Sequence, residues 1–506
     1  MTDEASPNTF DLLVVGGGIN GAGIARDAAG RGLRVMLVER DDLASHTSSA
    51  STKLIHGGLR YLEFMEFGLV RKSLIEREVL LNIAPHIISP LRFVMPHEPS
   101  LRPAWMIRIG LFLYDHLARR RKLESSRGID LRRHPAGAPL REGYVRGFEY
   151  SGGWVDDARL VVLNALDAAE HGATICTRTH CLGVTPATRA RDDGAPLWSA
   201  TLVDDTGKER TVTARAVVNA TGPWAAGFHD AAISLQSKHG LRLIKGSHIV
   251  VKKLFDHPYA YILQATDRRV VFAIPYEHKF TMIGTTDIEY HGDLRVVTID
   301  SEETEYLCKQ ANRYFRVNLT PSDVLSTWAG VRPLLEDESA DARTVTRDYA
   351  LELRQSSAPL LSVFGGKITS YRVLAEEAVD RITSALGERH RGWTSSSPLP
   401  GGELQSGLES IEEQLHALHP TIQQYTLRRW ASAYGSRAPK IFAASQLLGA
   451  EVAPGVYEAE LRYLCQTEWA RSVEDILWRR TKLGLHLNAQ SAQNVADWLT
   501  THGRSQ

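Results

Sequence analysis

The sequence contains few cysteines, no excess charge of either sign and no long uncharged hydrophobic run. Its 506 residues include four cysteines, at positions 176, 181, 308 and 465, and these form no C-x-x-C pair. So few cysteines cannot build a disulfide framework, and we expect a protein of the reducing cytosol without a metal site.

The charge balance argues against a nucleic-acid partner, because Lys and Arg total 59 and Asp and Glu also total 59. With a net charge of zero, no global field attracts a polyanion. Every hydrophobic run is shorter than the roughly 18 residues that a membrane-spanning helix needs. Residues 1–9 are polar, which predicts no signal peptide. We therefore expect any membrane contact to be peripheral.

The strongest positive pattern is FDLLVVGGGINGAGIARDAAGRGLRVMLVE at residues 10–39. An apolar strand runs into a G-x-G-x-x-G turn formed by Gly16, Gly18 and Gly21, and a helix and a second strand ending in Glu39 follow. Gly16 permits the sharp turn, Gly18 lets backbone amides approach a pyrophosphate, and Gly21 lets helix and strand pack closely. Glu39 can accept hydrogen bonds from a ribose and would repel a 2′-phosphate. The pattern predicts a dinucleotide site for FAD or NAD, and NADP is disfavoured.

A small-polar run follows the second strand, at residues 45–53, and leads into His56-Gly57-Gly58. The hydroxyls of Thr47 and Ser48 suit phosphate oxygens, and the His-Gly-Gly sequence suits close backbone approach to a planar ring. We interpret this stretch as a cofactor contact, with a solvated surface loop as the alternative. An esterase oxyanion hole is excluded, because the chain has no G-x-S-x-G elbow.

Two later apolar strands also end in glycine turns. The first runs into NATGPW, which contains Gly222, and the second runs into GGKITSYR, which contains Gly366, Lys367 and Thr369. A plain strand end is the alternative interpretation of NATGPW. We interpret both turns as further approaches to the cofactor. A nicotinamide-binding Rossmann domain needs neither turn, so they favour FAD over NAD.

The full set of motifs resembles the aerobic, FAD-dependent glycerol-3-phosphate dehydrogenases of the D-amino-acid-oxidase-like flavoproteins. The resemblance spans roughly residues 10–375 and rests on VVGGGINGAGIARDAAGRG, TSSASTKLIHGGLRYLE, APHIISPLRF, RPAWMIRIGLFLYDHL, GFEYSGGWVDDARLV, NATGPW, LIKGSHIVV, IGTTD, GVRPL, TRDY and FGGKITSYR. The stretch DILWRRTKLG at residues 475–484 is similar to the C-terminal domain of that family.

The resemblance implies oxidation of sn-glycerol 3-phosphate at C2 to dihydroxyacetone phosphate, with hydride transfer to flavin N5 and electrons passing to a membrane quinone. An oxidase that passes electrons to oxygen is the nearest alternative, since the motifs barely separate the two. The others are a flavin-binding interaction protein without catalysis and an NAD-linked dehydrogenase.

A phosphorylated polyol needs a cationic pocket, because burying an unpaired dianion is prohibitive. The candidates lie beside glycine-rich loops in LRY, GVRP, TRD and GGK contexts, and the expected substrate-binding residues are Arg60, Tyr61, Arg332, Arg347 and Lys367. His248, in KGSH, is the candidate base, with a hydrogen-bonded strand histidine as the alternative. Arg332 would polarise the alkoxide and could share the role of the base. Lys367 would face the flavin pyrimidine edge, which completes the expected catalytic set of His248, Arg332 and Lys367.

The chain predicts an α/β fold with a Rossmann-like FAD-binding domain, an antiparallel-sheet substrate domain and a C-terminal all-α domain. The FAD-binding domain is expected in three parts, residues 1–84, 147–240 and 331–391, interrupted by an excursion at 85–146 and the substrate domain at 241–330. A linker at 392–406 precedes the helical domain at 407–506.

One segment has the composition of a membrane-surface element. Residues 104–114 are apolar and aromatic, and Arg119-Arg120-Arg121-Lys122 follow directly. Such a pair suits an anionic lipid surface, and a buried core helix with a solvated basic end is the alternative. We expect peripheral attachment to the inner face of the cytoplasmic membrane. The oligomeric state stays open between a monomer and a homodimer.

Overall fold

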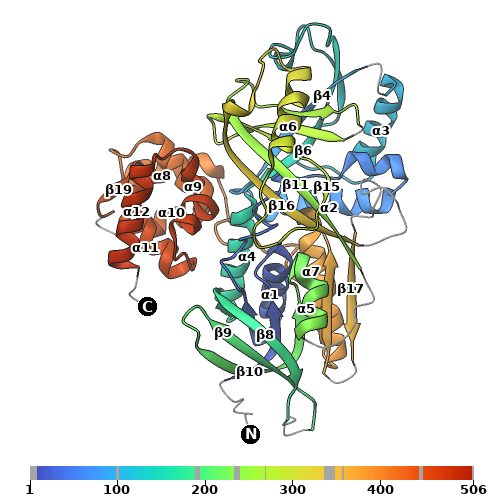
Figure 1. Ribbon diagram of the computed structural model, residues 1–506. Helices are drawn as coiled ribbons and strands as arrows, with labels where there is room; N and C mark the ends of the chain where they lie inside the picture. The colour runs from blue at the N-terminus through green and yellow to red at the C-terminus, as the bar shows by residue number, and fades with distance from the viewer. Residues whose placement is uncertain are drawn as a thin grey trace.

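The computed structural model describes residues 8–98, 102–188, 194–232, 240–267, 269–335, 348–355, 358–443 and 448–503. Within these residues the chain forms two sheets with their covering helices and a separate helical C-terminal domain (Figure 1). The predicted substrate ligand Arg347 lies outside the described residues, and so does the side chain of Arg60.

The first sheet is mainly parallel and carries the glycine turn. Its central order is β17 (Tyr349–Arg354), β18 (Leu360–Gly365), β10 (Glu209–Asn219), β1 (Thr9–Val15), β2 (Val35–Val38) and β7 (Thr174–Cys176). All neighbours on this path are parallel except β17 and β18, and the antiparallel strands β8 (Thr179–Pro186) and β9 (Trp198–Asp204) extend the sheet from β10. The apolar runs of β1 and β2 are buried, as expected for parallel strands covered on both faces.

Three helices pack together beside this sheet: α1 (Ile19–Gly30), α4 (Asp157–Glu170) and α7 (Tyr371–Ala385). Gly23 lets α1 approach α7 closely, because a Cβ there would lie 2.8 Å from the Tyr371 ring. The β1–α1–β2 unit is the predicted βαβ opening, and its glycine turn lies at the carboxyl edge of the sheet, where ligands bind in open α/β folds.

The second sheet has ten strands and is antiparallel apart from one pair, β12 with β4. Its path runs β15 (Ile288–Glu289), β11 (Leu241–Lys252), β14 (Phe280–Gly284), β13 (Val270–Tyr276), β12 (Ala260–Gln264), β4 (Ile88–Pro96), β6 (Arg146–Val155) and β3 (Leu54–Ile55). β16 (Val324–Leu335) pairs with β11, and β5 (Arg127–Asp130) pairs with β6. The sheet therefore draws strands from outside the 241–330 segment, and β16 continues past residue 330.

The long antiparallel pair of β11 and β16 places two predicted site residues on one face of this sheet. Gly246 lies opposite Gly330, His248 opposite Trp328, and Ile244 opposite Arg332. Alternate residues of a strand share a face. His248 and Arg332 are therefore directed to the same side, although 84 positions separate them in the chain.

Four further helices complete the two-sheet body: α2 (Phe67–Ile83), α3 (Ala104–His116), α5 (Ala225–Ala232) and α6 (Ser301–Tyr314). α6 begins in a capping box between Asp300 and Glu303, and its buried face includes Leu307 and Ala311. α3 lies on the side of the molecule away from the C-terminal domain in Figure 1. Among the described helices, none combines the length and hydrophobicity needed to cross a membrane.

The C-terminal domain contains α8 (Gly407–Leu418), α9 (Gln424–Tyr434), α10 (Ala438–Ala443), α11 (Glu458–Thr467) and α12 (Ala489–His502). It has its own core, in which Trp430 stacks on Phe442 with ring centroids 3.8 Å apart. The expected all-α character is confirmed apart from a small hairpin, β19 (Glu451–Ala453) with β20 (Val456–Tyr457). The preceding stretch, predicted as a linker, packs on the body: the Leu399 amide donates to the Ile83 carbonyl.

Candidate active site

A cavity of 530 Å³ lies between the carboxyl edge of the first sheet and the second sheet. Most of the predicted site residues line it, namely Gly16, Gly18, Glu39, Thr47, Ser48, His56, Tyr61, Gly222, His248, Arg332, Gly366, Lys367 and Thr369. Residues that are distant in the sequence thus share one chamber, with the glycine turns on one side and the His248–Arg332 face on the other. The predicted residues Gly21, Gly57 and Gly58 are not among those that line it.

The glycine turn needs glycine at two positions. Gly16 has a φ of +113°, and a Cβ there would lie 2.5 Å from the Ala220 carbonyl oxygen. A Cβ on Gly21 would lie 1.9 Å from the Gly16 oxygen. Behind His56, a Cβ on Gly57 would lie 2.5 Å from Leu74, and Gly58 has a φ of +72°.

The amino end of α1 faces this turn. Its cap residue, Gly18, has no side chain that could accept a hydrogen bond from the first amides of the helix. The Ile19 amide donates to Ser48 Oγ at 3.0 Å, and a Cβ on Gly18 would lie 3.1 Å from the same oxygen. Thr47 Oγ1 donates to the Val331 carbonyl at 2.7 Å, which ties this wall to β16. A helix amino terminus beside hydroxyls is a suitable environment for a diphosphate.

Glu39 ends β2, and its carboxylate is held by backbone amides. Gly17 N donates to Oε2 at 2.6 Å and Asp41 N donates to Oε1 at 2.8 Å. Burial raises the pKa of Glu39, and the two amides act in the opposite direction. Atoms of Glu39, Asp41 and His46 lie within 4.8 Å of one another, but His46 Nε2 is already bonded to Asp41 at 2.8 Å. The cluster is satisfied internally and gives no reason to place a metal here.

His248 is buried on the second-sheet side of the cavity. Its Nε2 lies 3.0 Å from Thr52 Oγ1, and its ring stacks on Trp328 at a centroid distance of 5.3 Å. Burial holds the pKa of His248 well below its usual value, and Lys53 and Arg332 lower it further. The imidazole is therefore neutral at physiological pH. Gly284 makes room for the ring, because a Cβ there would lie 2.1 Å from His248 Cδ2.

Arg332 lies beside His248 on the same face, with its side chain 28% exposed. Its Nη2 donates to Asp287 Oδ1 at 2.6 Å and to the Thr286 carbonyl at 3.2 Å. Gly246 allows this approach, since a Cβ on it would lie 2.7 Å from Arg332 Nη2. The carboxylate fixes the guanidinium, and the remaining exposure leaves the group accessible from the cavity.

Lys367 comes from the glycine turn after β18 and precedes the turn that opens α7. Its Nζ lies 4.0 Å from the centroid of the Tyr61 ring, within cation–π range. Thr369 Oγ1 accepts a hydrogen bond from the His56 amide at 3.4 Å. These contacts join the glycine turn after β18 to the stretch that contains His56 and Tyr61, on one wall of the cavity.

Several cavity residues were not among the predicted ones. Thr52, which bonds His248, lies in the small-polar run, and Thr285 lies in IGTTD, so both belong to stretches that the motifs had marked. Asn20 donates from Nδ2 to the Gly365 carbonyl at 3.3 Å and so joins the first glycine turn to the last. Thr179 to Leu182 of β8 also line the cavity, and no local motif indicated them.

Comparison with known families decides the class of protein. Residues 11–372 match the model of the FAD-dependent oxidoreductases. The chain belongs to this family. Residues 393–502 match the family model described as the C-terminal domain of alpha-glycerophosphate oxidase, so the helical domain also belongs to a known domain family. The predicted enzyme class, the FAD cofactor and the α/β fold with a helical C-terminal domain are confirmed.

Individual relatives cover almost the whole of this flavoprotein chain. A glycerol-3-phosphate dehydrogenase of Pseudomonas aeruginosa is 52% identical over 97% of this chain and 95% of its own length. A D-erythritol 1-phosphate dehydrogenase of Brucella abortus is 49% identical over 98% of each. Among solved structures, a Bacillus halodurans glycerol-3-phosphate dehydrogenase in complex with FAD has a TM-score of 0.77 at 28% identity, covering 99% of this chain and 92% of that one.

The residues of the cavity fit FAD. Gly16 and Gly18 line the cavity without side chains of their own, and the amino end of α1, whose cap residue Gly18 makes no side-chain hydrogen bond, adds positive potential for a diphosphate. Glu39, at the tip of β2, lies where the second strand of such a fold meets the ribose. The glycine turn at Gly365-Gly366, with φ values of +75° and +98°, allows the backbone of the third segment to approach the opposite end of the cavity.

Proposed function

We propose that this flavoprotein oxidises sn-glycerol 3-phosphate at C2 to dihydroxyacetone phosphate. The observation that carries the proposal is the placement of Arg332, Lys367 and a buried neutral His248 around one cavity with the cofactor-binding glycine turns. The names of the full-length relatives, led by the 52% identical enzyme, support the same substrate.

The cations bind the substrate phosphate in this proposal. Arg332 and Lys367 contribute charge-assisted hydrogen bonds, each stabilising the complex by about 1.5–3 kcal/mol. Tyr61 orients Lys367 through the ring contact. Arg60 and Arg347 are additional candidates from the sequence. Phosphate held at one end positions C2, since binding energy from a remote group contributes to orientation of the reacting centre.

His248 accepts the proton of the C2 hydroxyl. FAD, when bound, supplies the two-electron acceptor that takes the hydride from C2. The neutral imidazole carries one nitrogen lone pair at working pH, and Thr52 fixes the ring orientation through Nε2. Its lowered pKa makes it a weak base in the free protein. A bound phosphate dianion introduces negative charge beside Arg332 and raises that pKa, so substrate strengthens the base. Arg332 stabilises the developing alkoxide.

The test is reduction of bound FAD under anaerobic conditions. Addition of sn-glycerol 3-phosphate should bleach the visible flavin band, and glycerol should do so far less efficiently because it lacks the phosphate. Comparable rates with glycerol would refute the assignment of the cations. An absence of bleaching by either compound would refute the reaction.

D-Erythritol 1-phosphate is a second candidate substrate, since the relative named for it is 49% identical over almost the full length. The two compounds share a phosphate and a neighbouring secondary alcohol, which the same cations and base can address. We expect the ratio of kcat/KM values to favour sn-glycerol 3-phosphate. A higher kcat/KM for D-erythritol 1-phosphate would make that compound the substrate in place of sn-glycerol 3-phosphate.

We further propose a membrane quinone as the electron acceptor. The relatives matched over their full lengths are named as dehydrogenases, whereas the C-terminal family description contains the word oxidase, which keeps the oxygen-linked alternative open. Stoichiometric hydrogen peroxide during aerobic turnover would establish the oxidase. Reduction of a soluble quinone analogue without peroxide supports the proposal.

A quinone dissolved in the membrane requires the enzyme to attach to a lipid surface, and α3 has an exposed apolar face suited to such attachment. The exposed fractions of Trp105, Ile109 and Phe112 are 65%, 52% and 56%, and Met65 of the neighbouring turn is 71% exposed. An exposed apolar patch of this kind marks an interaction site. Arg119, Arg121 and Lys122 are exposed directly after the helix. We propose that α3 docks on anionic lipid at the cytoplasmic face of the membrane.

A further inference from the structure

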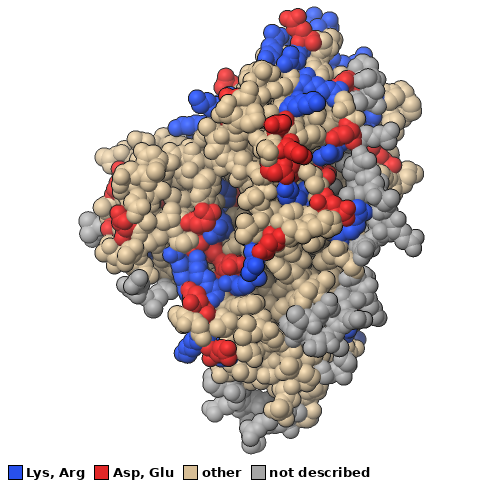
Figure 2. Space-filling view, viewed as in Figure 1, with Lys and Arg blue, Asp and Glu red and all other residues tan. Residues whose placement is uncertain are grey.

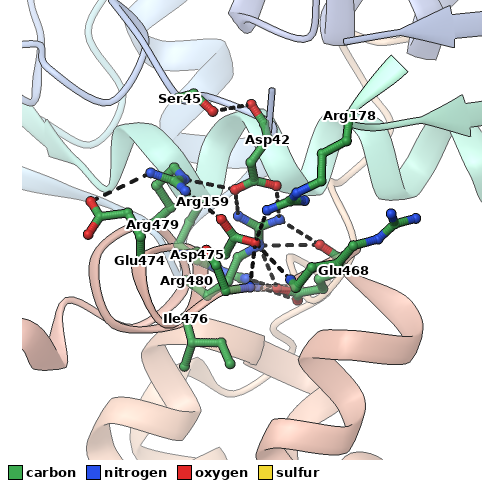
Figure 3. A network of polar contacts seen from close by, with 12 residues as sticks. Asp42, Ser45, Arg159, Arg178, Glu468, Glu474, Asp475, Ile476, Arg479 and Arg480 are labelled. Carbon is green, nitrogen blue, oxygen red and sulfur yellow. Dashed lines mark hydrogen bonds and ion pairs between the residues drawn. The ribbon is translucent and has the colours of Figure 1, made fainter. Parts of the chain in front are cut away.

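None of the described residues of the C-terminal domain lines the cavity, yet this domain is joined to the cofactor-binding part by a buried ionic network (Figure 3). Figure 2 shows charged side chains of both signs gathered where this domain meets the rest of the molecule. The network centres on Asp42, which lies three residues after Glu39. We call residues 40–53, which follow Glu39 and contain Thr47 and Ser48, the cofactor loop.

Three guanidinium nitrogens of the C-terminal domain converge on the Asp42 carboxylate. Arg480 donates from Nη1 to Oδ2 at 2.6 Å and from Nη2 to Oδ1 at 2.8 Å, which is a bidentate pair. Arg479 adds a third bond from Nε at 2.7 Å. Arg480 is 1% exposed and Asp42 is 3% exposed, so solvent screens the pair little. Bidentate, charge-assisted bonds fix geometry as well as adding energy.

Asp42 lies behind the cavity wall. Its chain neighbours Arg40, Ala44 and Ser45 line the cavity, while its carboxylate points to Arg480, as Figure 3 shows. Its carbonyl oxygen accepts a hydrogen bond from Ser45 Oγ at 2.5 Å. A shift of Asp42 would therefore displace residues that face the cofactor, although Asp42 itself is on the other side of the loop.

The loop conformation also needs external support. Ala44 and Lys53 have φ values of +62° and +57°, in the left-handed region that residues other than glycine disfavour. Such a backbone persists where its surroundings hold it in place. Ala44 is tied to the glycine turn, because its amide donates to the Gly17 carbonyl at 3.2 Å.

The far end of the loop is linked to the same domain through the start of α4. Lys53 Nζ donates to Asp157 Oδ1 at 2.7 Å, and Ser51 Oγ donates to Asp157 Oδ2 at 2.7 Å. The neighbouring Asp156 caps α4 and accepts a bond from Lys482 Nζ of the C-terminal domain at 3.0 Å. The Asp42 end of the cofactor loop is thus bonded directly to Arg479 and Arg480, and the Lys53 end is connected to Lys482 indirectly, through the start of α4.

Arg178 forms a third connection. Its backbone amide donates to the Asp41 carbonyl at 2.8 Å, and its guanidinium donates to Asp475 Oδ2 at 2.6 Å. Asp475 also accepts from Arg479 Nη2 at 2.5 Å. The loop, the turn between β7 and β8, and the C-terminal domain therefore share one set of ion pairs.

We propose that the C-terminal helical domain retains FAD, with Arg480 as the positioning residue that holds the cofactor loop through the Asp42 carboxylate. The role is separate from substrate chemistry and does not depend on which polyol phosphate is oxidised. Loosening this contact weakens FAD binding and leaves the reaction of loaded enzyme unchanged.

The test measures the FAD dissociation constant of Asp42→Asn and Arg480→Lys by fluorescence titration of FAD-free protein. Asp42→Asn should raise it at least tenfold, and Arg480→Lys, which keeps the charge, should have a smaller effect. At saturating FAD, kcat should stay within twofold of the parent. The control is Arg437→Gln, which removes an exposed pair with Glu170 between the same two domains and should leave the dissociation constant unchanged.

Hydrogen exchange separates positioning from general damage. In FAD-free Asp42→Asn, backbone amides of residues 40–50 should exchange faster while those of α9 keep their protection. Should Asp42→Asn fail to fold, Arg479→Gln, which leaves the buried pair intact, is expected to raise the dissociation constant a few-fold. A dissociation constant within twofold of the parent in a folded Asp42→Asn protein, or an equal loss in Arg437→Gln, would overturn the proposal. Faster exchange throughout the C-terminal domain would also overturn it.

Discussion

Arg332 shows how the position of a single side chain depends on neighbours far along the chain. Its Nη2 donates to Asp287 and to the Thr286 carbonyl, and Thr286 Oγ1 donates to the buried Glu303 at 2.7 Å. Lys245 neutralises Glu303 at 2.7 Å. A hydrogen-bonded polar network thus fixes the guanidinium in place, which suits the phosphate-binding role proposed for it.

Arg332→Gln should retain FAD and lose substrate affinity and rate. Removing one charge-assisted bond of about 1.5–3 kcal/mol corresponds to a loss of roughly 10- to 150-fold in kcat/KM. The measurement is anaerobic flavin reduction over a range of sn-glycerol 3-phosphate concentrations. Arg269→Gln is the control, since Arg269 lies in the turn before β13 of the same sheet and pairs with Asp267. An unchanged kcat/KM in Arg332→Gln would remove Arg332 from the site.

The base proposed at His248 predicts a pH dependence of the reaction in a defined direction. Because burial, Lys53 and Arg332 lower its pKa, the base form persists below the usual histidine range. The acid limb of kcat/KM should therefore lie below pH 6.5, with activity falling as pH drops through the lowered pKa. His248→Asn should reduce kcat by about 10²- to 10⁴-fold and abolish this limb. An identical limb in the variant would assign the base to another group.

At the scale of single elements, α3 differs from the other described helices because it exposes several large apolar side chains. Its buried side includes Ile107, Leu111 and Tyr114, while Trp105, Ile109 and Phe112 face solvent. The sequence suggested either an interfacial element or a core helix, and the helix has features of both, with one packed face and one exposed apolar face.

The double variant Ile109→Gln/Phe112→Gln should bind anionic vesicles several-fold more weakly while keeping its activity toward a soluble acceptor. Two apolar side chains that enter the headgroup region are lost, whereas the fold is untouched because both are exposed. Co-sedimentation measures the bound fraction. Leu418→Gln, an equally conservative change at an exposed residue of α8, is the control. Equal binding by the double variant and the parent would exclude this face.

At the scale of the whole molecule, the parts meet at buried charges and at a buried neutral histidine. His86 follows α2 and is 4% exposed. Its pKa is lowered to about 3 by burial, and Arg159 and Arg437 act in the same direction. A Cβ on Gly401, in the stretch before the C-terminal domain, would lie 3.2 Å from its Nε2. His86 therefore belongs to the junction between the parts.

His86 should make the protein less stable in mild acid. The unfolded chain takes up a proton near pH 6.5 and the folded chain does not until about pH 3. Stability therefore falls as pH drops between these values, by about 1.4 kcal/mol per pH unit for this group. Between pH 6.5 and 5.0 this amounts to about 2 kcal/mol, and His86→Gln should reduce the pH dependence by that amount. Urea denaturation at several pH values provides the measurement, and an unaltered slope would contradict the prediction.

The family, the cofactor and the location of the glycine turns could be predicted from the sequence. A G-x-G-x-x-G turn between two apolar strands is a local pattern, and its demands, such as the 1.9 Å approach of a Gly21 Cβ to the Gly16 oxygen, act between residues close in the chain. The helical character of the C-terminal domain could likewise be predicted from local hydrophobic patterns. These features follow from steric and hydrophobic rules over a few residues.

The tertiary structure alone decided which residues meet. Strand pairing brought β4, β5 and β6 into the second sheet, and hydrophobic pattern does not determine a pairing partner. Thr52 reaches His248 across 196 positions, and Asp42 reaches Arg480 across 438. The sequence predicted cations and a histidine for the site, but not the carboxylate beside Arg332 or the lowered pKa of His248. Those depend on burial and on charges brought close by folding, because electrostatic interactions act through space and not along the chain.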